Sequence, residues 1–414
     1  LATGHFAPAV HAEVALTLAE IYQQQWRLSP VEALLADARA QSELVPEDLA
    51  LAARVLTAEG KLAYNRNNYT LAKERYLSAL QAIANSPDQR SLLATIKNNL
   101  GELHLAQGAF AEGIAAHSEA LKIRRTLFPD GNQKVGESLQ NLAGGERANG
   151  QLENAEQHYR EAIVMQRQAL GEEHPEVATA ISNLSVLLMS RGRLDEAQAL
   201  ADDAWAIRRQ VFGDQHPQTA NSLHNVASLA VQRGDYARAV PLLQRSIETH
   251  QDLFGEQHIA VAAGMNNLGK AYIAQGQYES ACEILARAIA RFEQADPPNP
   301  LAAYFYYNLA AAELKTERGE DALQSVQTAI ARLPADHADQ ALFRTLQGSV
   351  LAELGKNFDS RRLFLDALRD VQASRGTQSD AYSAAYERAS SYFRRVNDVS
   401  ALNVLAALEP PRAD

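Results

Sequence analysis

The chain has 414 residues, a net charge of −11 and a pI of about 5.5. An acidic chain binds nucleic-acid phosphates poorly, so we expect no nucleic-acid partner and a protein partner that is basic or neutral. One cysteine, Cys282, excludes an internal disulfide and a cysteine-rich zinc site. No stretch approaches about 18 uncharged apolar residues, so we expect no membrane insertion.

The N-terminal stretch "LATGHFAPAVHAEVALTLAEIY" lacks a basic start and carries Glu13 within its apolar part. These features favour a helix over a signal peptide. Residues 1–45 show helical periodicity without the repeat described next. We therefore predict a degenerate helix pair there, as expected for the water-facing end of a repeat array.

Residues 46–296 form the predicted repeat array, and its clearest copies lie within 90–295. An asparagine recurs at 42-residue intervals, and a glycine follows each one nine residues later. The five asparagines are Asn99, Asn141, Asn183, Asn225 and Asn267, and the glycines are Gly108, Gly150, Gly192, Gly234 and Gly276. We predict that each glycine separates a first helix, A, from a second helix, B.

Small residues mark the B helices. They stand five and twelve positions after each glycine: Gly113, Ala155, Ala197, Ala239 and Ala281, then Ala120, Ala162, Ala204, Ser246 and Ala288. Residues seven apart share one helix face, so these positions predict a close approach of A and B. Upstream, Ala72 and Ala79 continue the register.

A histidine precedes each later A helix, at His174, His216 and His258. Neighbouring helix axes lie about 8–10 Å apart, so these side chains cannot share one metal ion. We expect them to mark the loop before helix A, with Pro175 and Pro217 in its first turn.

Further pairs are predicted over 297–376. Asn308 opens one pair with Gly319 near its turn, and Gly355, Ser360 and Ala367 fit the next. The prolines at 297, 298 and 300 predict a stiffer joint between pairs. Residues 377–414 are expected to be capping helices and a tail.

These positions resemble the tetratricopeptide repeat (TPR). The 42-residue period and linkers such as "LGEEHPEVA" are similar to the repeats of kinesin light chain and its bacterial relatives. No heptad coiled coil precedes the repeats, so kinesin binding is not implied. The resemblance implies an all-α, right-handed TPR solenoid of about ten antiparallel helix pairs.

Two interpretations of the repeated asparagine remain open. Each carboxamide could bond a neighbouring helix and hold the stack in register. Alternatively, as the TPR resemblance implies, the A helices line a concave groove and the carboxamide contacts the backbone of an extended peptide, with both a donor and an acceptor. The predicted peptide-binding residues are Asn99, Asn141, Asn183, Asn225, Asn267, Asn308, Asn98, Gln140, His224, Asn266, Lys270, Tyr304 and Tyr307.

Other inward positions refine this hypothesis. They include Thr95, Glu102 and Glu137, and among the clear repeats Lys270 is the only cation, which argues against a clamp for a C-terminal carboxylate. Tyr304 and Tyr307 are either interface anchors or ordinary packing residues. The glycines in "LAGGERANG" soften an A helix or leave space for a ligand side chain.

No phosphate-binding loop, HExxH, GxSxG or dinucleotide motif is present. We therefore expect no enzyme activity, cofactor or metal. Paired arginines such as Arg124–Arg125 and Arg208–Arg209 are interpreted as solvated surface.

The sequence thus predicts a non-catalytic module that binds a protein or an extended peptide. It would be the recognition part of a larger bacterial signalling protein, in the cytoplasm, or in the periplasm if that protein is a membrane-anchored kinase. The alternative is a structural scaffold or spacer that self-associates through its end repeats, without a peptide ligand.

Overall fold

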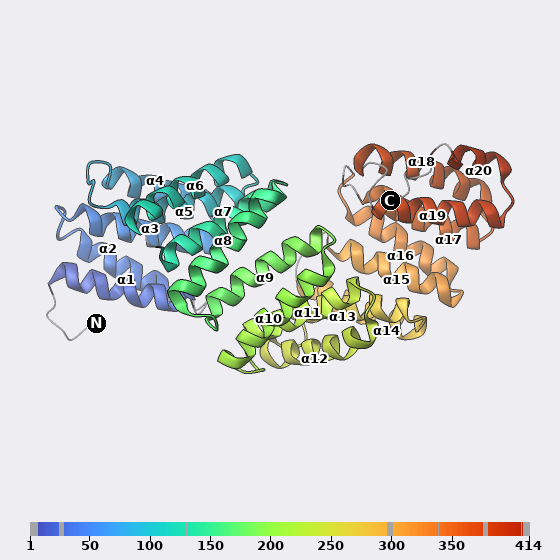
Figure 1. Ribbon diagram of the computed structural model, residues 1–414, viewed down its shortest axis with the longest axis horizontal. Coiled ribbons are helices and arrows are strands. Elements are labelled where there is room, and N and C mark those ends of the chain that lie inside the picture. Colours follow the sequence, from blue (N-terminus) through green and yellow to red (C-terminus); the bar gives the residue numbers. More distant parts are fainter. Residues whose placement is uncertain are drawn as a thin grey trace. The chain divides into compact units, whose positions relative to one another are not determined.

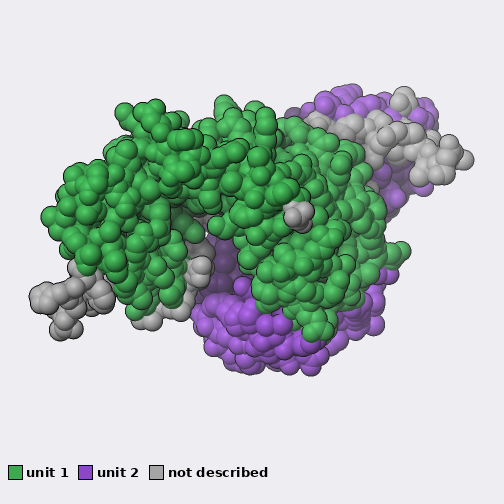
Figure 2. Space-filling model, turned by 60° about the vertical axis from the view of Figure 1, so that its left-hand side comes forward, with its two compact units in different colours: residues 1–207 green, residues 208–414 purple. Residues whose placement is uncertain are grey.

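The computed structural model describes residues 7–24, 29–129, 131–295, 301–335, 337, 339–375, 380–406 and 408. All regular structure in these ranges is helical, which confirms the predicted all-α solenoid. The prolines at 297, 298 and 300, with the joint predicted there, lie outside the described residues, as do residues 409–414 of the predicted tail. The chain divides into two compact units, 1–207 and 208–414 (Figure 2).

Unit 1 is built from helices that lie side by side in antiparallel pairs (Figure 1). Its helices are α1 (Pro8–Gln24), α2 (Ser29–Ser42), α3 (Leu49–Asn65), α4 (Tyr69–Ala82), α5 (Arg90–Ala106), α6 (Phe110–Leu127), α7 (Gln133–Ala148), α8 (Leu152–Leu170), α9 (Pro175–Ser190) and the first part of α10 (Leu194–Phe212).

Unit 2 continues the same alternation. It contains α11 (Pro217–Gln232), α12 (Tyr236–Phe254), α13 (Ile259–Ala274), α14 (Tyr278–Ala295), α15 (Ala302–Glu313), the short 3₁₀ helix η1 (Leu314–Thr316), α16 (Gly319–Arg332), α17 (Gln340–Glu353), α18 (Asn357–Arg375), α19 (Asp380–Arg395) and α20 (Val399–Ala406). Odd-numbered helices are the A helices and even-numbered ones the B helices.

The small residues of the B helices lie in the contact with helix A, as predicted. The side chains of Ala155, Ala162, Ala281 and Ala288 are completely buried, and so is that of Ser246. Larger B residues pack where the A helix offers a glycine. A Cβ added at Gly101 would lie 2.7 Å from the His117 ring, and one at Gly269 would lie 2.5 Å from Leu285. These glycines let the two helices approach closely.

The predicted glycines end the A helices. Gly150 has φ +77°, and the next residue donates its backbone N–H to the Glu146 carbonyl, which is a Schellman closure. Gly319 lies near the turn of its pair, as predicted, but it does not make the reversal: Glu317 holds the left-handed conformation, at φ +60°, and Gly319 begins α16. A Cβ at Gly319 would lie 2.8 Å from Leu354, so close packing explains that glycine instead.

The three recurring histidines lie directly before A helices, as predicted, and the structure shows that they cap these helices. The Nδ1 atoms of His174, His216 and His258 accept hydrogen bonds from the backbone N–H two residues later, at 3.2, 3.3 and 3.3 Å. Pro175 and Pro217 are the first helical residues. A ring nitrogen thus takes the place of the usual Ser or Asp oxygen.

The interpretation of the paired arginines as surface is wrong for their first members. Arg124 and Arg208 are only 6% and 8% exposed, and each donates to a serine hydroxyl, of Ser138 at 2.9 Å and Ser222 at 2.5 Å. An arginine fork with partners inside its own unit can be buried at moderate cost.

Two substitutions in one repeat test the glycine geometry. Gly150→Ala should lower the free energy of unfolding by about 1 kcal/mol, because alanine is strained at this positive φ. Gly144→Ala, inside α7, should raise it by about 0.5 kcal/mol, because a Cβ there makes an ordinary 3.7 Å contact with Tyr159. Urea titrations of both proteins measure the effects; equal changes of one sign would contradict this assignment.

Candidate binding groove

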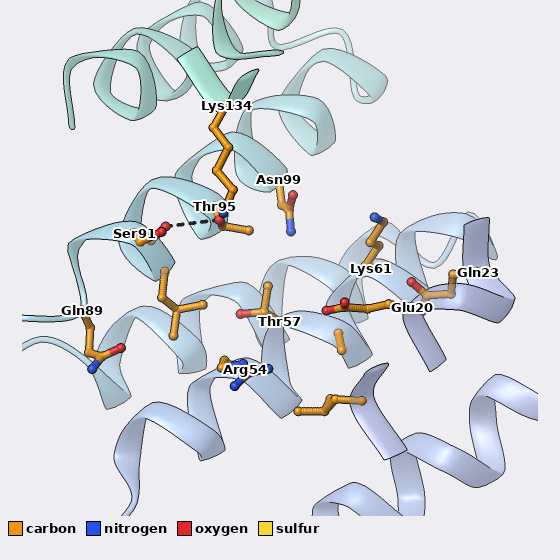
Figure 3. A pocket seen from close by; sticks show the side chains of 13 residues that line it. Glu20, Gln23, Arg54, Thr57, Lys61, Gln89, Ser91, Thr95, Asn99 and Lys134 are labelled. Atoms are coloured by element: carbon orange, nitrogen blue, oxygen red, sulfur yellow. Dashed lines mark hydrogen bonds between the residues drawn. The ribbon is translucent and has the colours of Figure 1, made fainter. Parts of the chain in front are cut away.

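A cavity of about 490 Å³ lies on the face of unit 1 that the A helices form (Figure 3). Its thirteen lining residues come from α1, α3, α5 and α7 or, in one case, from the residue before α5; no B helix contributes. They are Leu16, Glu20, Gln23, Arg54, Thr57, Ala58, Lys61, Gln89, Ser91, Leu92, Thr95, Asn99 and Lys134. Figure 2 shows unit 1 curving around a hollow.

The lining is polar with an excess of positive charge. In Figure 3 the Lys134 side chain extends from α7 toward Thr95, and Asn99 and Lys61 project into the same opening. Arg54 pairs with Glu13. Within the described residues, neither lysine has a carboxylate partner within 4.0 Å. The opening thus offers two ammonium groups and the Glu20 carboxylate beside hydroxyl and amide groups.

Sequence reasoning missed the contribution of α3. Counting back nine residues from Asn67, which has φ +59° at the end of α3, places Ala58 at the position of the repeated asparagine. Arg54 and Lys61 then match the inward positions of Thr95 and Glu102. Because alanine replaces asparagine at this position, the repeat signature is absent from α3. Arg54 and Lys61 were therefore not recognised as inward cations beside Lys270.

Four of the six repeated asparagines bond the preceding A helix. The Nδ2 atom of Asn141 donates to Asn98 Oδ1 at 3.0 Å, and that of Asn183 donates to Gln140 Oε1 at 3.2 Å. In unit 2, Asn308 donates to Asn266 Oδ1 at 2.8 Å.

Asn267 donates instead to Ser228 Oγ, at 2.8 Å. These four bonds hold successive A helices in register. We call the row of repeated asparagine positions along the A helices the ladder. Contact with a peptide by the same side chains remains a prediction.

The other two asparagines differ. Asn99 lines the cavity and, within the described residues, makes no such bond to α3. Asn225 lies in α11, half-buried, next to His224. Burial lowers the pKa of His224 to about 4, and its ring meets that of His250 edge-on at 6.4 Å. Lys270 is exposed on α13.

A buried polar network surrounds the first bond of the ladder, the one between Asn141 and Asn98. Asn98 Oδ1 accepts from Asn141 and lies 3.0 Å from His117 Nδ1, while Asn98 Nδ2 donates to Glu102 at 3.1 Å. The His117 side chain is fully buried, and this burial lowers its pKa to about 4. Burial also raises the pKa of Glu102, although Lys61 and the Asn98 amide oppose the shift. The imidazole is therefore neutral and donates from Nδ1.

The predicted aromatic anchors pack within unit 2. Tyr307 stacks on Phe343 at 4.4 Å between ring centroids, and Tyr304 meets the same ring edge-on at 5.5 Å. The Tyr304 hydroxyl donates to Asp339 at 2.5 Å. These contacts are those of the packing interpretation, and a peptide contact by either tyrosine remains a prediction.

Two of the three glycines of "LAGGERANG", Gly144 and Gly145, lie within the continuous helix α7. A Cβ at Gly145 would lie 3.2 Å from Ile114 and 3.3 Å from Leu105, so internal packing explains the smaller residue there. Gly144 is less constrained. No ligand space is needed to account for Gly145.

Among the described residues, no cluster of three or more His, Cys, Asp or Glu side chains could hold a metal ion. Nor does any described helix meet the length and hydropathy needed to cross a membrane.

An all-α solenoid of A–B helix pairs with a polar inner face defines a class of repeat proteins. A tetratricopeptide-repeat profile matches residues 92–163, 135–191, 176–252, 225–294 and 260–335, together more than half of the chain. The chain therefore belongs to the tetratricopeptide repeat family. No curated protein gives a significant match.

Solved structures are also similar. BtubC (BKLC) from P. vanneervenii is 26% identical, with 54% of this chain and 91% of that chain covered and a TM-score of 0.47. The apo form of the quorum sensor NprR from B. thuringiensis is 13% identical, with 89% and 99% covered and a TM-score of 0.62. A Rap protein complexed with Competence and Sporulation Factor is 14% identical, with 86% and 99% covered and a TM-score of 0.53. The latter two show a shared fold.

The buried imidazole predicts a specific pH dependence. An unfolded histidine titrates near pH 6.5, whereas folded His117 titrates at about 4. Between these values the unfolded state binds a proton that the folded state does not, so stability falls as the pH falls. Titration of His117 should therefore lower the free energy of unfolding of the wild type by up to about 3 kcal/mol across this pH range. His117→Leu should not show this decrease.

Leucine suits this site because Leu285 packs on Gly269 as His117 packs on Gly101. Urea midpoints of the wild type and the variant, measured from pH 7.5 to 4, provide the comparison. Glu102 is present in both proteins, so the difference reports the imidazole. Parallel pH profiles would contradict the assignment.

Proposed function

We propose that the protein is a non-catalytic interaction module that binds an extended segment of a partner protein along its A helices. The observation that carries this proposal is the cavity in unit 1, whose lining comes from four successive repeats and includes Asn99. A site spread over several repeats suits an extended chain better than a compact small molecule. This function agrees with the general role of the family as an interaction scaffold.

The lining defines the chemistry of the preferred segment. Asn99 can both donate and accept, and Thr57, Ser91 and Thr95 add hydroxyl groups. Lys61 and Lys134 favour a neutral or acidic side chain near Asn99 over a basic one. Net charge alone favoured basic or neutral partners, so the local charge of the groove changes that expectation for unit 1.

We further propose that this chain is the recognition part of a larger bacterial signalling protein. The quorum sensor NprR and the Rap protein in complex with Competence and Sporulation Factor share its fold, at low identity. The proposed compartment is the cytoplasm, or the periplasm if the larger protein is a membrane-anchored kinase.

Self-association through an end of the array is the second candidate function. Phe358 is 79% exposed and Val399 is 59% exposed, both in the last repeats of unit 2. Exposed apolar side chains at a solenoid end favour contact with another copy. Light scattering over a range of concentrations distinguishes this function from peptide binding.

A cavity-filling substitution tests the proposed groove. Ala58→Trp places an indole at the ladder position of α3 and should weaken binding of a selected peptide at least about tenfold. Lys73 is exposed on α4, the B helix of the same repeat, so Lys73→Trp is the matched control and should leave binding unchanged. Peptides would be selected from a phage-displayed random library on the full chain, and affinities measured by calorimetry.

Both variants should melt within a few degrees of the wild type. If Ala58→Trp binds the selected peptides as tightly as Lys73→Trp, the unit 1 groove is not their binding surface. If the library yields no binder while scattering shows oligomers, self-association is the better account.

A further inference from the structure

Three A helices place a glutamate against the B helix of their own pair. In each pair the facing residue stands three positions after the first small residue of the B helix. The glutamates and their facing residues are Glu59 with Arg75, Glu146 with His158 and Glu313 with Ser325. In the first pair a guanidinium nitrogen lies 3.0 Å from the carboxylate, and in the second an imidazole nitrogen lies 2.8 Å from it. Two of the carboxylates thus face a group that can carry positive charge, whereas the third faces a hydroxyl.

Glu313 lacks a built-in counter-ion. Its side chain is 7% exposed, and its Oε2 atom is enclosed without a hydrogen-bond partner in the described parts of the chain. Burial raises the pKa of this carboxyl, and a hydrogen bond from Ser325 and the charge of Arg318 offset the rise only in part. Arg318 directs its Nε–H at Thr316, at 2.9 Å, and forms no ion pair with a described carboxylate. A buried carboxylate without a counter-ion is costly.

A cavity of about 480 Å³ adjoins Glu313, between α14 and the C-terminal end of α15, and we call it the α14–α15 cavity. Its lining residues are Glu279, Cys282, Glu283, Ala286, Leu309, Glu313, Thr316 and Arg318. Three carboxylates against one guanidinium give this lining an excess of negative charge. Cys282, Ala286 and Leu309 add an apolar wall. The volume lies in the range of small-molecule sites.

We propose that the α14–α15 cavity binds a guanidinium group on an alkyl stem, which supplies Glu313 with the counter-ion that Glu59 has in Arg75. A guanidinium suits a buried ion pair because it is more weakly hydrated than an ammonium group. The last torsion of a glutamate side chain is broad, so Oε2 can turn toward the cavity without a backbone change. The exposed Glu279 and Glu283 attract the cation, and Leu309 contacts its stem. The site belongs to unit 2 and does not depend on a peptide in the groove of unit 1.

Two probes carry the proposed group: agmatine, a free alkylguanidinium, and the peptide acetyl-Gly-Arg-Gly-amide. Ligand-observed NMR titrations of the full chain, at an ionic strength that screens its acidic surface, should give dissociation constants on the order of 1 mM. The same peptide with citrulline, a neutral isostere of arginine, should bind at least about tenfold more weakly. Tighter binding of the arginine peptide than of agmatine assigns the site to an arginine of a partner protein, and the reverse order assigns it to a free small molecule.

A matched pair of variants locates the bound cation. Glu313→Gln keeps the size of the side chain, removes its charge and should weaken both probes at least about tenfold. Glu146→Gln changes the equivalent buried carboxylate, which has His158 beside it, and should leave both affinities unchanged. Failure of both probes to bind the wild type would overturn the proposal, because Glu313 would then be neutralised by its own proton. Equal affinities for the wild type and Glu313→Gln would overturn it as well.

A tethered guanidinium provides a second test, which does not remove a buried group. Ala286→Arg introduces the cation at the lining of the cavity, so it should raise the melting temperature and weaken agmatine at least about tenfold. Ala290→Arg adds the same side chain at an exposed position of α14 outside the lining and should do neither. Unchanged agmatine binding by Ala286→Arg would contradict the proposed site.

Discussion

The close approach of two helices within each pair is the constraint on which the rest of the structure depends. It requires small residues where the B helix meets the A helix, and Ala155, Ala162, Ala281 and Ala288 are buried there without remaining exposure. It also requires a tight reversal, which a left-handed residue such as Gly150 supplies. Because the B helix of each pair packs on one side of its A helix, successive A helices lie next to one another and form the polar face.

Features with a local cause could be predicted from the sequence. The reversal at Gly150 and the position of the histidines directly before the A helices follow from chemistry within a few residues of each position. The burial of Arg124 and Arg208 could not, because their serine partners stand fourteen residues away on another helix. Similarly, the sequence showed Asn141 as a repeated amide but not which atom of Asn98 it would meet.

The sequence predicted a polar groove along the A helices, but it identified only some of the residues that line the cavity. Asn99 lies in the cavity, whereas Arg54 and Lys61 were missed because Ala58 interrupts the signature. Repeat detection depends on identity at a few positions, and Ala58 does not match the asparagine expected at one of them. A repeat that has lost its marker residue can therefore still contribute to the groove.

The polar inner face holds the stack together with the same side chains that the proposed function assigns to ligand contact. Asn98 satisfies His117, Glu102 and Asn141 at once, so a mutation there would disturb packing as well as any ligand contact. Alanine scanning of the ladder therefore cannot by itself identify a binding surface. Substitutions that separate donor from acceptor are more informative than those that delete both.

Helix α19, the last A helix in the described part of the chain, separates two causes of the backward hydrogen bond. One is the position of the residue on the A helix, and the other is the type of residue there. Counting back nine residues from Asn397, which has φ +53° after α19, places Arg388 at the ladder position. Its guanidinium donates to Thr345 Oγ1 at 3.3 Å, on the preceding A helix, and lies 5.6 Å from the Tyr307 ring centre. A backward bond thus occurs again at this position with a different donor, because geometry requires only reach and an N–H. Neither this arginine nor Leu346, at the equivalent position of α17, has a side-chain acceptor, so the row of amide Oδ1 atoms ends before these two helices.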